Sequence, residues 1–397
     1  MRNDPACRLQ KTLTTGPFKG VNPPITDSAT FAFDDGPAMT DCFEGKSENA
    51  FLYSRHWNPT NRALARALAA MENTESAWVT GSGMAAITSA ILQICNSGDH
   101  IVSSMTTYGG TYAFLKNYLP KFNIEVSFVD ISDLEAVRAA IRPSTKILYT
   151  ESLTNPLLQV SDIPSLAEIA NQNGLKLLVD NTFTPMIINP CDLGAHLTLY
   201  SMTKFINGQN DCVAGAICGS GEFINDLIDV NKGTCMLLGP VLDPIRASGI
   251  HKNLFTLHIR MRQHSKNAAY LAAKMFDNGL KVTYPGLNNH PQHQLMKSIM
   301  NPEYGFGGLL SIDMETSHKA NELMVRMQNI GVGYLAVSLG YFKTLFSNSS
   351  KSTSSEVPEE LQNKMGLSPG LTRFSVGLDQ DIDATWQSIH NILRDIS

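Results

Sequence analysis

The sequence predicts an α/β fold with a mostly parallel sheet, followed by a smaller α+β domain. Short apolar segments of strand length alternate with segments of helical periodicity through the middle of the chain. Such alternation is typical of βαβ units, whose parallel strands are covered by helices on both faces. After about residue 250 the alternation gives way to a long helix with scattered strands, which favours a separate α+β domain.

Seven apolar segments are predicted to form the strands of the sheet. They are residues 77–80, 100–103, 125–129, 146–149, 176–179, 197–200 and 214–218. Helices are expected between several of these strands, at residues 84–95, 133–140 and 163–172. In the C-terminal part, helices are expected at residues 259–276, 318–330 and 383–394, with strands at 309–314 and 373–376.

These patterns divide the chain into three parts. Residues 1–60 are rich in Pro, Asp, Thr and Asn and predict an extended N-terminal arm. Residues 61–255 form the predicted sheet domain and residues 256–397 the predicted C-terminal domain, in which the serine-rich run 347–356 predicts a loop. An arm with little core of its own must dock on another surface. If that surface is a neighbouring subunit, Arg55 could complete a phosphate site there; the alternative is a solvated surface arginine.

Composition and charge exclude several classes of function. The 397 residues are 43% hydrophobic and 17% charged, which is ordinary for a globular enzyme. The net charge is −5 and no basic stripe indicates nucleic-acid binding. No apolar run is long enough for a membrane span, and the first residues lack the apolar core of a secretion signal. Seven cysteines without a CxxC pair support neither a disulfide framework nor a metal site, so we expect a cytoplasmic protein.

An acid and a lysine follow two neighbouring predicted strands. Asp180 ends one strand, and Lys204 comes shortly after the next, between Ser201, Thr203 and a glycine-bearing turn. Pyridoxal 5'-phosphate (PLP) needs such a pair, a lysine for its aldehyde and a carboxylate for its pyridine nitrogen. A single lysine in a polar loop is usually a solvated charge. However, the C-terminal ends of strands in an α/β sheet are where ligands bind.

A second turn has the features of a phosphate site. Gly81-Ser82-Gly83-Met84 lies between a predicted strand and a predicted helix, where free backbone N–H groups bind anions. Such turns are also common as purely structural features. With Ser201 and Thr203 as additional donors, the sequence predicts a phosphate pocket.

Three other side chains are candidates for contacts with a ligand, and each has a simpler alternative. Tyr108 follows a strand and could stack on a cofactor or donate a proton, or be a packed loop aromatic. Asn155 precedes a proline and could contact a ligand or only form a turn. Arg373 lies in an apolar strand and needs a partner, either a substrate carboxylate or a structural salt bridge.

The order of these motifs resembles the Cys/Met metabolism family of PLP-dependent enzymes, also called cystathionine-γ-synthase-like, nearly from end to end. The segments that carry the resemblance include Tyr53-Ser54-Arg55, Ser82-Gly83-Met84-Ala85-Ala86, Tyr108-Gly109-Gly110-Thr111, Glu151-Ser152 with Asn155-Pro156, Val179-Asp180-Asn181-Thr182-Phe183, Ser201-Met202-Thr203-Lys204, Ser338-Leu339-Gly340 and Arg373-Phe374-Ser375-Val376-Gly377. The resemblance implies the aspartate-aminotransferase-like fold, fold type I, with a seven-stranded sheet that binds PLP in residues 61–255. It also implies a homotetramer, built as a pair of dimers with shared active sites.

The resemblance also implies a role for each site residue. Lys204 would form the Schiff base with PLP and later move protons, and Asp180 would bind the pyridine nitrogen. Tyr108 would stack on the ring and act as acid or base toward the leaving group. The phosphate would be held by Gly83, Met84, Ser201 and Thr203, and by Tyr53 and Arg55 of the partner subunit. The substrate, an amino acid, would be bound by Arg373, Ser338, Asn155 and Tyr53.

Within this family the chain is most similar to plant-type methionine γ-lyases. We therefore expect γ-elimination of L-methionine, or of a close sulfur amino acid, to a thiol, ammonia and 2-oxobutanoate. The alternatives are a cystathionine γ-lyase or γ-synthase, an O-acylhomoserine sulfhydrylase, and a non-catalytic protein on the same fold. Three positions depart from patterns common in the family. Gln209 stands where many members have a histidine, and Lys343 stands where a glutamate is common. Gly110 stands where bacterial methionine γ-lyases often have a cysteine. If Lys343 faced the site, it would repel the distal ammonium of cystathionine.

Overall fold

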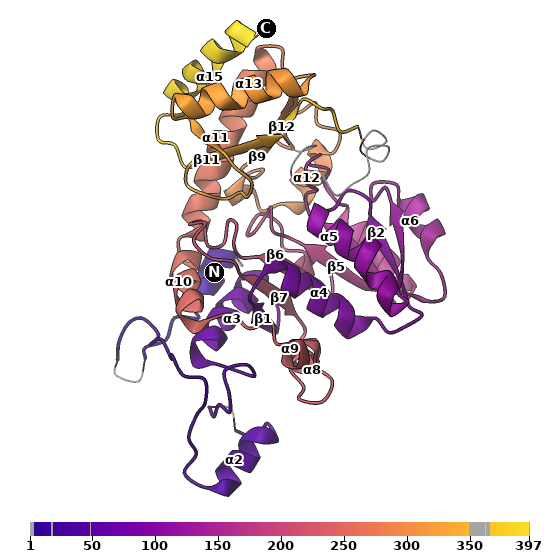
Figure 1. The fold of residues 1–397 in the computed structure, drawn as a ribbon, viewed down its shortest axis with the longest axis vertical. Coiled ribbons are helices and arrows are strands. Elements are labelled where there is room, and N and C mark those ends of the chain that lie inside the picture. The colour runs from indigo at the N-terminus through magenta and orange to yellow at the C-terminus, as the bar shows by residue number, and fades with distance from the viewer. Residues whose placement is uncertain (1–3, 17–18, 48, 349–361, 363–365, 397) are drawn as a thin grey trace.

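A computed structural model describes residues 4–16, 19–47, 49–348, 362 and 366–396 (Figure 1). Within these residues, a large sheet contains seven strands in the order β1-β7-β6-β5-β4-β2-β3. The strands are β1 (Ser76–Thr80), β2 (His100–Ser104), β3 (Glu125–Val129), β4 (Thr145–Glu151), β5 (Lys176–Asp180), β6 (Leu197–Ser201) and β7 (Gly215–Gly219). Only β7 runs antiparallel to its neighbours, β1 and β6. The predicted seven-stranded, mostly parallel sheet is confirmed.

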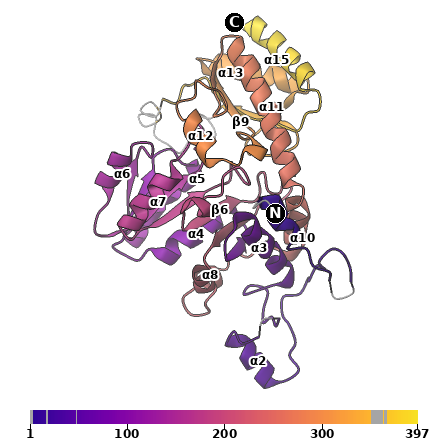
Figure 2. The same ribbon diagram turned by 180° about the vertical axis from the view of Figure 1, so that it is seen from behind.

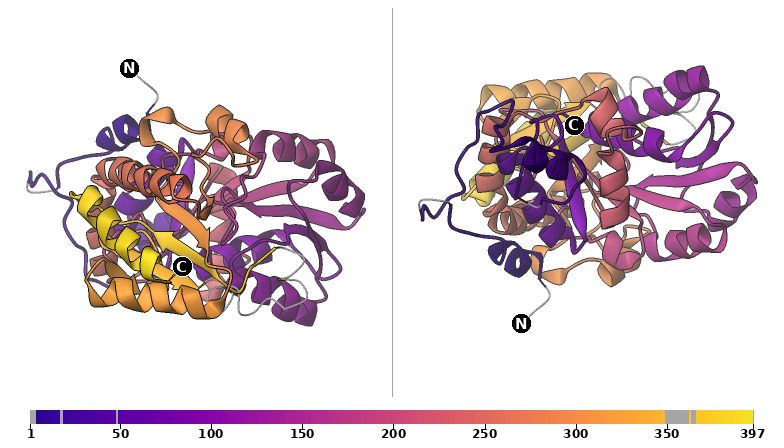
Figure 3. Two further views of the ribbon diagram at one scale, coloured as in Figure 1. Left: turned by 90° about the horizontal axis from the view of Figure 1, so that it is seen from above. Right: turned by 90° about the horizontal axis from the view of Figure 1, so that it is seen from below.

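Both faces of the large sheet are buried, because alternate residues of each strand enter different core clusters. In β5, Leu177 and Val179 pack with α3 (Pro59–Glu72), α7 (Ile163–Gln172) and α10 (Pro244–Leu254). Leu178, between them, packs on the other face with α4 (Gly83–Ile94). Figure 3 shows helices on both sides of these strands. This double burial explains why the strands are continuous apolar runs in the sequence.

A second sheet lies in the C-terminal part of the chain. Its order is β10-β11-β12-β9-β8, and only β10 and β11 are parallel. The strands are β8 (Lys281–Thr283), β9 (Leu309–Asp313), β10 (Gly333–Leu335), β11 (Thr344–Asn348) and β12 (Leu371–Ser375). The helices α11 (Leu257–Asp277), α13 (Ser317–Asn329) and α15 (Ile382–Ile396) share a separate apolar core with this sheet (Figure 1).

The predicted α+β region was therefore correct, but the sequence did not reveal β8, β10 and β11. Two of these strands have only three residues, too few for a period-2 pattern. The predicted loop 347–356 was wrong at its start, because Ser347 and Asn348 belong to β11. Its remaining residues lie outside the described part of the chain.

The N-terminal arm contains more structure than its composition predicted. Its helices are α1 (Pro5–Gln10) and α2 (Gly36–Phe43). Leu9 of α1 is buried in the main core, whereas α2 lies away from the rest of the molecule (Figures 1 and 2). The predicted boundaries between the arm and the two domains remain predictions.

The other helices are short and connect the strands. They are α5 (Gly109–Ala113), η1 (Phe114–Tyr118), η2 (Leu119–Phe122), α6 (Leu134–Ala140), η3 (Cys191–Leu193), α8 (Gly221–Leu227), α9 (Thr234–Leu238), α12 (His293–Ile299) and η4 (Pro302–Tyr304). Among the described residues, we find no helix with the length and apolar character needed to cross a membrane.

Candidate active site

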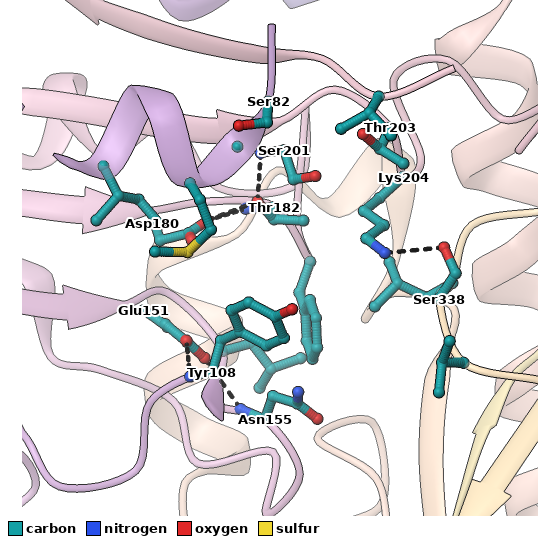
Figure 4. A pocket seen from close by; sticks show the side chains of 18 of the residues that line it. Ser82, Tyr108, Glu151, Asn155, Asp180, Thr182, Ser201, Thr203, Lys204 and Ser338 are labelled. Atoms are coloured by element: carbon teal, nitrogen blue, oxygen red, sulfur yellow. Dashed lines mark hydrogen bonds between the residues drawn. The ribbon is translucent and has the colours of Figure 1, made fainter. Parts of the chain in front are cut away.

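A pocket of about 370 Å³ lies where β4, β5 and β6 end, and the C-terminal region closes its other side. It brings together most of the residues predicted from the sequence: Gly83, Met84, Tyr108, Asn155, Asp180, Ser201, Thr203, Lys204, Ser338 and Arg373. Figure 4 shows Lys204 and Ser338 across the pocket from Asp180 and Glu151. Tyr53 and Arg55 are not among its lining residues. Instead, Arg55 donates to the carbonyl oxygen of Met236 at 2.7 Å, and Tyr53 is 47% exposed.

One end of the pocket is formed by the start of α4. Ser82 caps this helix, since its Oγ accepts a hydrogen bond from the backbone N–H of Ala85 at 3.0 Å. Gly83 packs directly against Ser201, and a Cβ at position 83 would lie 2.7 Å from the Cβ of Ser201. Position 83 therefore requires glycine, because any side chain would separate the helix terminus from β6. The free N–H groups of this terminus and the nearby hydroxyls suit a phosphate group.

The acid of the pocket, Asp180, is the last residue of β5 and is buried. Its carboxylate accepts two hydrogen bonds, both from Thr182: 3.0 Å from the backbone N–H and 2.6 Å from the hydroxyl. Burial raises the pKa of Asp180, because the charged form loses hydration. Neither of these partners is a cation. A positively charged ligand group beside Asp180 would restore its ordinary ionisation.

The lysine lies across the pocket, shortly after β6. The Nζ of Lys204 donates to the Oγ of Ser338 at 2.8 Å. Burial lowers the pKa of Lys204 to about 8, and the nearby charge of Arg373 acts in the same direction. A substantial fraction of this amine is therefore neutral near physiological pH. Only the neutral form is a nucleophile or a base.

Arg373, on β12, is buried and points toward the same pocket. Its Nη1 donates to Oδ1 of Asn155 at 2.9 Å, and its Nη2 to the carbonyl oxygen of Ser338 at 3.0 Å. Its Nε has no partner, and among the described residues no carboxylate forms a salt bridge with it. Burial without a counter-charge lowers the pKa of Arg373 to about 10. Of the two sequence-based alternatives, the structural salt bridge is not formed with any described residue, and the role in binding a substrate carboxylate stays a prediction.

Two residues that the sequence reasoning missed also line the pocket, Glu151 and Thr182. Glu151 ends β4 opposite Asp180 and accepts hydrogen bonds from the backbone N–H groups of Tyr108 at 2.6 Å and Asn155 at 3.1 Å. Burial, reinforced by the charge of Asp180, raises the pKa of Glu151 to about 8. Glu151 is therefore largely neutral at pH 7. Glu151 could have been recognised from the sequence as an acidic residue at the end of an apolar strand, the same pattern that identified Asp180.

The structure also explains one of the three departures from common family patterns. A Cβ at Gly110 would lie 2.6 Å from the ring of Tyr108, so the ring occupies space that a cysteine side chain would take. Lys343 does not line the pocket, so the sequence-based argument that it repels a distal ammonium has no support. The apolar residues Val213, Val337 and Leu339 line the pocket instead.

The residues present fit PLP in three respects. The Gly83 terminus offers a close backbone approach for a phosphate, and the buried Asp180 lacks a cationic partner among the described residues. Lys204 offers an amine with a lowered pKa between these groups and Arg373. This donor set contains the acid, amine and phosphate cradle that PLP needs.

Comparison with known proteins decides the family. A model described as Cys/Met metabolism PLP-dependent enzyme matches residues 9–388. The chain belongs to this family. The predicted family, PLP cofactor and fold are thereby confirmed, and the chain is a PLP-dependent enzyme of the carbon-sulfur lyase type.

Relatives within the Cys/Met metabolism family differ in their named activities. The chain is 46% identical to methionine gamma-lyase of Arabidopsis thaliana over 377 residues, which is 94% of this chain and 86% of the relative. It is 37% identical to cystathionine gamma-lyase of Bacillus subtilis over 350 residues, 87% and 89% of the two chains. A crystal structure of a putative O-acetylhomoserine (thiol)-lyase from Campylobacter jejuni has a TM-score of 0.91 at 26% identity, covering 98% of this chain and 99% of the other. That structure contains N'-pyridoxyl-lysine-5'-monophosphate.

Proposed function

We propose that this enzyme catalyses γ-elimination of L-methionine, or of a close sulfur amino acid, to a thiol, ammonia and 2-oxobutanoate. One observation supports this choice within the family. The charged residues that line the pocket are Glu151, Asp180, Lys204 and Arg373. Glu151 is largely neutral, and the other three suit the cofactor and a carboxylate. The remaining side chains available to the substrate are mainly apolar, as a thioether prefers.

In this proposal the pocket holds PLP at three points. Lys204 would bond the aldehyde, Asp180 would bind the pyridine nitrogen, and the phosphate would lie against Gly83, Met84, Ser201 and Thr203. Tyr108 would stack on the ring, with its backbone fixed by Glu151. When bound, PLP supplies an electron sink for the negative charge that develops on the substrate.

The side chains of the enzyme would then bind the substrate and move its protons. Arg373 would bind the α-carboxylate with two N–H groups and would be oriented by its bond to Asn155. Lys204, steadied by Ser338, would remove the α-proton, pass it on to the cofactor and, neutral again, remove a proton from the β-carbon. Tyr108 would donate a proton to the sulfur as the γ-carbon–sulfur bond breaks. One water molecule is consumed as ammonia and 2-oxobutanoate are released.

We further propose a cytoplasmic homotetramer in which Tyr53 and Arg55 reach the phosphate of a neighbouring subunit. Both residues lie outside their own pocket. The arm that carries them exposes Phe43 at 60% and Val21 at 80%, and such apolar surface suits a contact with another chain. The cytoplasmic location is supported by seven free cysteines. Mass measurement in solution would test the assembly, and a monomer with full activity would contradict it.

The activity is tested by incubating the PLP-loaded enzyme with L-methionine and measuring methanethiol and 2-oxobutanoate. Parallel assays would use cystathionine, and O-acylhomoserine with sulfide. We expect methionine to be the best substrate. Faster turnover of acylhomoserine with sulfide would make the enzyme a sulfhydrylase, and preference for cystathionine would make it a cystathionine lyase.

A further inference from the structure

The turn that follows Lys204 is held by a buried arginine from a distant helix. Arg260, on α11, donates from Nη1 to the carbonyl oxygen of Phe205 and from Nη2 to that of Ile206, the latter at 2.9 Å. Its Nη2 also donates to the carbonyl oxygen of Asn253 at 2.9 Å, and its Nε to Oγ1 of Thr256 at 3.2 Å. Four hydrogen bonds therefore fix the guanidinium, and two of them end on the two residues after Lys204.

This arginine is unusual in its charge environment. Arg260 is only 9% exposed, and among the described residues no carboxylate lies within salt-bridge distance of it. Burial lowers its pKa to about 10. Burying an unpaired cation is costly unless its hydrogen bonds are satisfied. Here carbonyl oxygens and one hydroxyl satisfy it, and the planar guanidinium holds its donors in a fixed geometry that matches two successive carbonyl groups better than a compact ammonium does.

The turn itself is shaped to receive the guanidinium. Gly208 closes the turn, since its N–H donates to the carbonyl oxygen of Lys204 at 2.8 Å. A Cβ at Gly208 would lie 2.6 Å from Nη1 of Arg260, and the φ of this residue is +72°. Both the space and the backbone conformation therefore require glycine. Arg260 and the turn thus fit each other closely.

The same backbone also lies close to Gly340, in the loop that follows β10. A Cβ at Gly340 would lie 2.5 Å from the backbone nitrogen of Phe205. The ring of Phe205 packs edge-on against His264, one turn after Arg260 on α11, with centroids 5.2 Å apart. The backbone that follows Lys204 is therefore bound by Arg260 and packed closely against Gly340.

We propose that Arg260 is a positioning residue for catalysis: it fixes the turn after Lys204 and thereby sets where the Lys204 amine lies in the pocket. This inference rests on the proposed role of Lys204 in binding PLP and moving protons. Arg260 itself does not line the pocket. The competing explanation is that Arg260 only joins α11 to the large-sheet region and contributes stability without affecting the amine.

The test compares Arg260→Lys with a matched control, Arg8→Lys. Arg8 on α1 also donates to two successive backbone carbonyl groups, those of Ala70 at 2.7 Å and Met71 at 2.6 Å, at the end of α3. Each variant keeps the positive charge but loses the planar guanidinium that binds two successive carbonyl groups. The first readout is the thermal unfolding midpoint of the apoenzyme. The second is the pH dependence of PLP uptake, followed by borohydride reduction and mass measurement of the Lys204 peptide. The third is kcat and KM for methionine.

We expect both substitutions to lower the unfolding midpoint, but only Arg260→Lys to change the chemistry. Misplacing the amine by about 1 Å should lower kcat on the order of 100-fold. The pH midpoint of PLP uptake should also rise from about 8 toward 10.5, because a loosened amine becomes better hydrated. Normal kcat and an unchanged pH midpoint in Arg260→Lys would overturn the proposal.

A milder variant keeps the test decisive if Arg260→Lys does not fold. Thr256→Val removes the hydroxyl that accepts from Nε of Arg260 and donates to the carbonyl oxygen of Asn253, and we expect a smaller change in the same direction. A Thr256→Val enzyme that matches the wild type in both kcat and pH midpoint would then count against the proposal. Failure of the proposed role of Lys204, on which this inference rests, has a different signature. In that case the wild-type Lys204 peptide would itself carry no pyridoxyl group.

Discussion

The two sides of the pocket differ in charge and in how they are built. The acidic side consists of Asp180 and Glu151, which end neighbouring strands of one sheet and are paired in register. The basic side consists of Lys204 and Arg373, which come from the two different sheet regions. Burial raises the pKa of both acids and lowers that of both bases. Each side is therefore closer to neutral than free side chains would be.

The hydrogen bonds on the two sides also differ in the sequence separation between their partners. Asp180 accepts two hydrogen bonds from Thr182, and Glu151 accepts one from Asn155, four residues on, and one from Tyr108, 43 positions away. Lys204, by contrast, is held by Ser338, 134 positions away, and Arg373 binds Asn155 across 218 positions. All partners of the acidic side thus belong to the large-sheet region, at the strand ends and in the loops that follow them. The basic side exists only when the C-terminal region is in place.

Lys204→Ala should have the largest effect, because it removes the proposed base and the bond to PLP. Positioned proton transfer alone contributes about 10² to 10⁴-fold, so we expect a loss of at least about 10³-fold in methionine turnover. The measurement is 2-oxobutanoate production by PLP-loaded enzyme. The control is Lys297→Ala on the exposed face of α12, which should retain full activity. Substantial turnover by Lys204→Ala would refute the proposed role.

Arg373→Lys should have the next largest effect, and mainly on KM. The substitution keeps the charge but loses paired hydrogen bonds to a carboxylate, which are worth about 1.5–3 kcal/mol or roughly 10 to 100-fold. Steady-state kinetics with methionine would measure this increase. Arg326→Lys, at an exposed ion pair on α13, is the control and should leave KM unchanged. An unchanged KM in Arg373→Lys would place the substrate carboxylate elsewhere.

The lowered pKa of Lys204 predicts a particular pH dependence for cofactor uptake. Only the neutral amine bonds an aldehyde, so PLP uptake by the apoenzyme should accelerate as pH rises and level off above about pH 8. An ordinary lysine would continue to accelerate toward 10.5. Because Arg373 contributes to the shift, Arg373→Met should move this midpoint upward. The same midpoint in both proteins would show that the two basic residues are not electrostatically coupled.

Glu151→Gln should have the smallest effect on activity, since Glu151 is already largely neutral at pH 7. Its effect should appear in the pH dependence of stability. The pKa of Glu151 is raised from 4.5 to about 8, so the folded state keeps a proton that the unfolded state releases. The free energy of unfolding therefore falls as pH rises between these values. Denaturant unfolding of the apoenzyme should show a weaker fall for Glu151→Gln than for the wild type. Glu135→Gln, at an exposed glutamate, should not alter the slope.

This contrast between sides explains how much could be predicted from the sequence. The strands of the large sheet, Asp180 at the end of β5 and the Gly83 turn follow from apolar runs and the residues that interrupt them. Asn155 was a candidate from its position after a strand, whereas Ser338 was assigned only through resemblance to a family. Arg260 was not identified, because a basic residue on an amphipathic helix is normally a solvated charge. Its role depends on the carbonyl groups of a turn 54 positions away, and such a pairing leaves no local pattern.

The contacts of the C-terminal region with the Lys204 backbone have a consequence for the evolution of this enzyme. Arg373, Gly340 and Arg260 all belong to the C-terminal part of the chain. Arg373 lines the pocket, and Gly340 and Arg260 contact the backbone beside Lys204. The C-terminal region therefore both binds the substrate and positions Lys204, the proposed base. A mutation that re-aims Arg373 toward a new amino acid would also disturb the reacting amine. Variation in substrate preference is consequently easiest at pocket side chains that do not contact the Lys204 turn or Arg373, such as the exposed Val213.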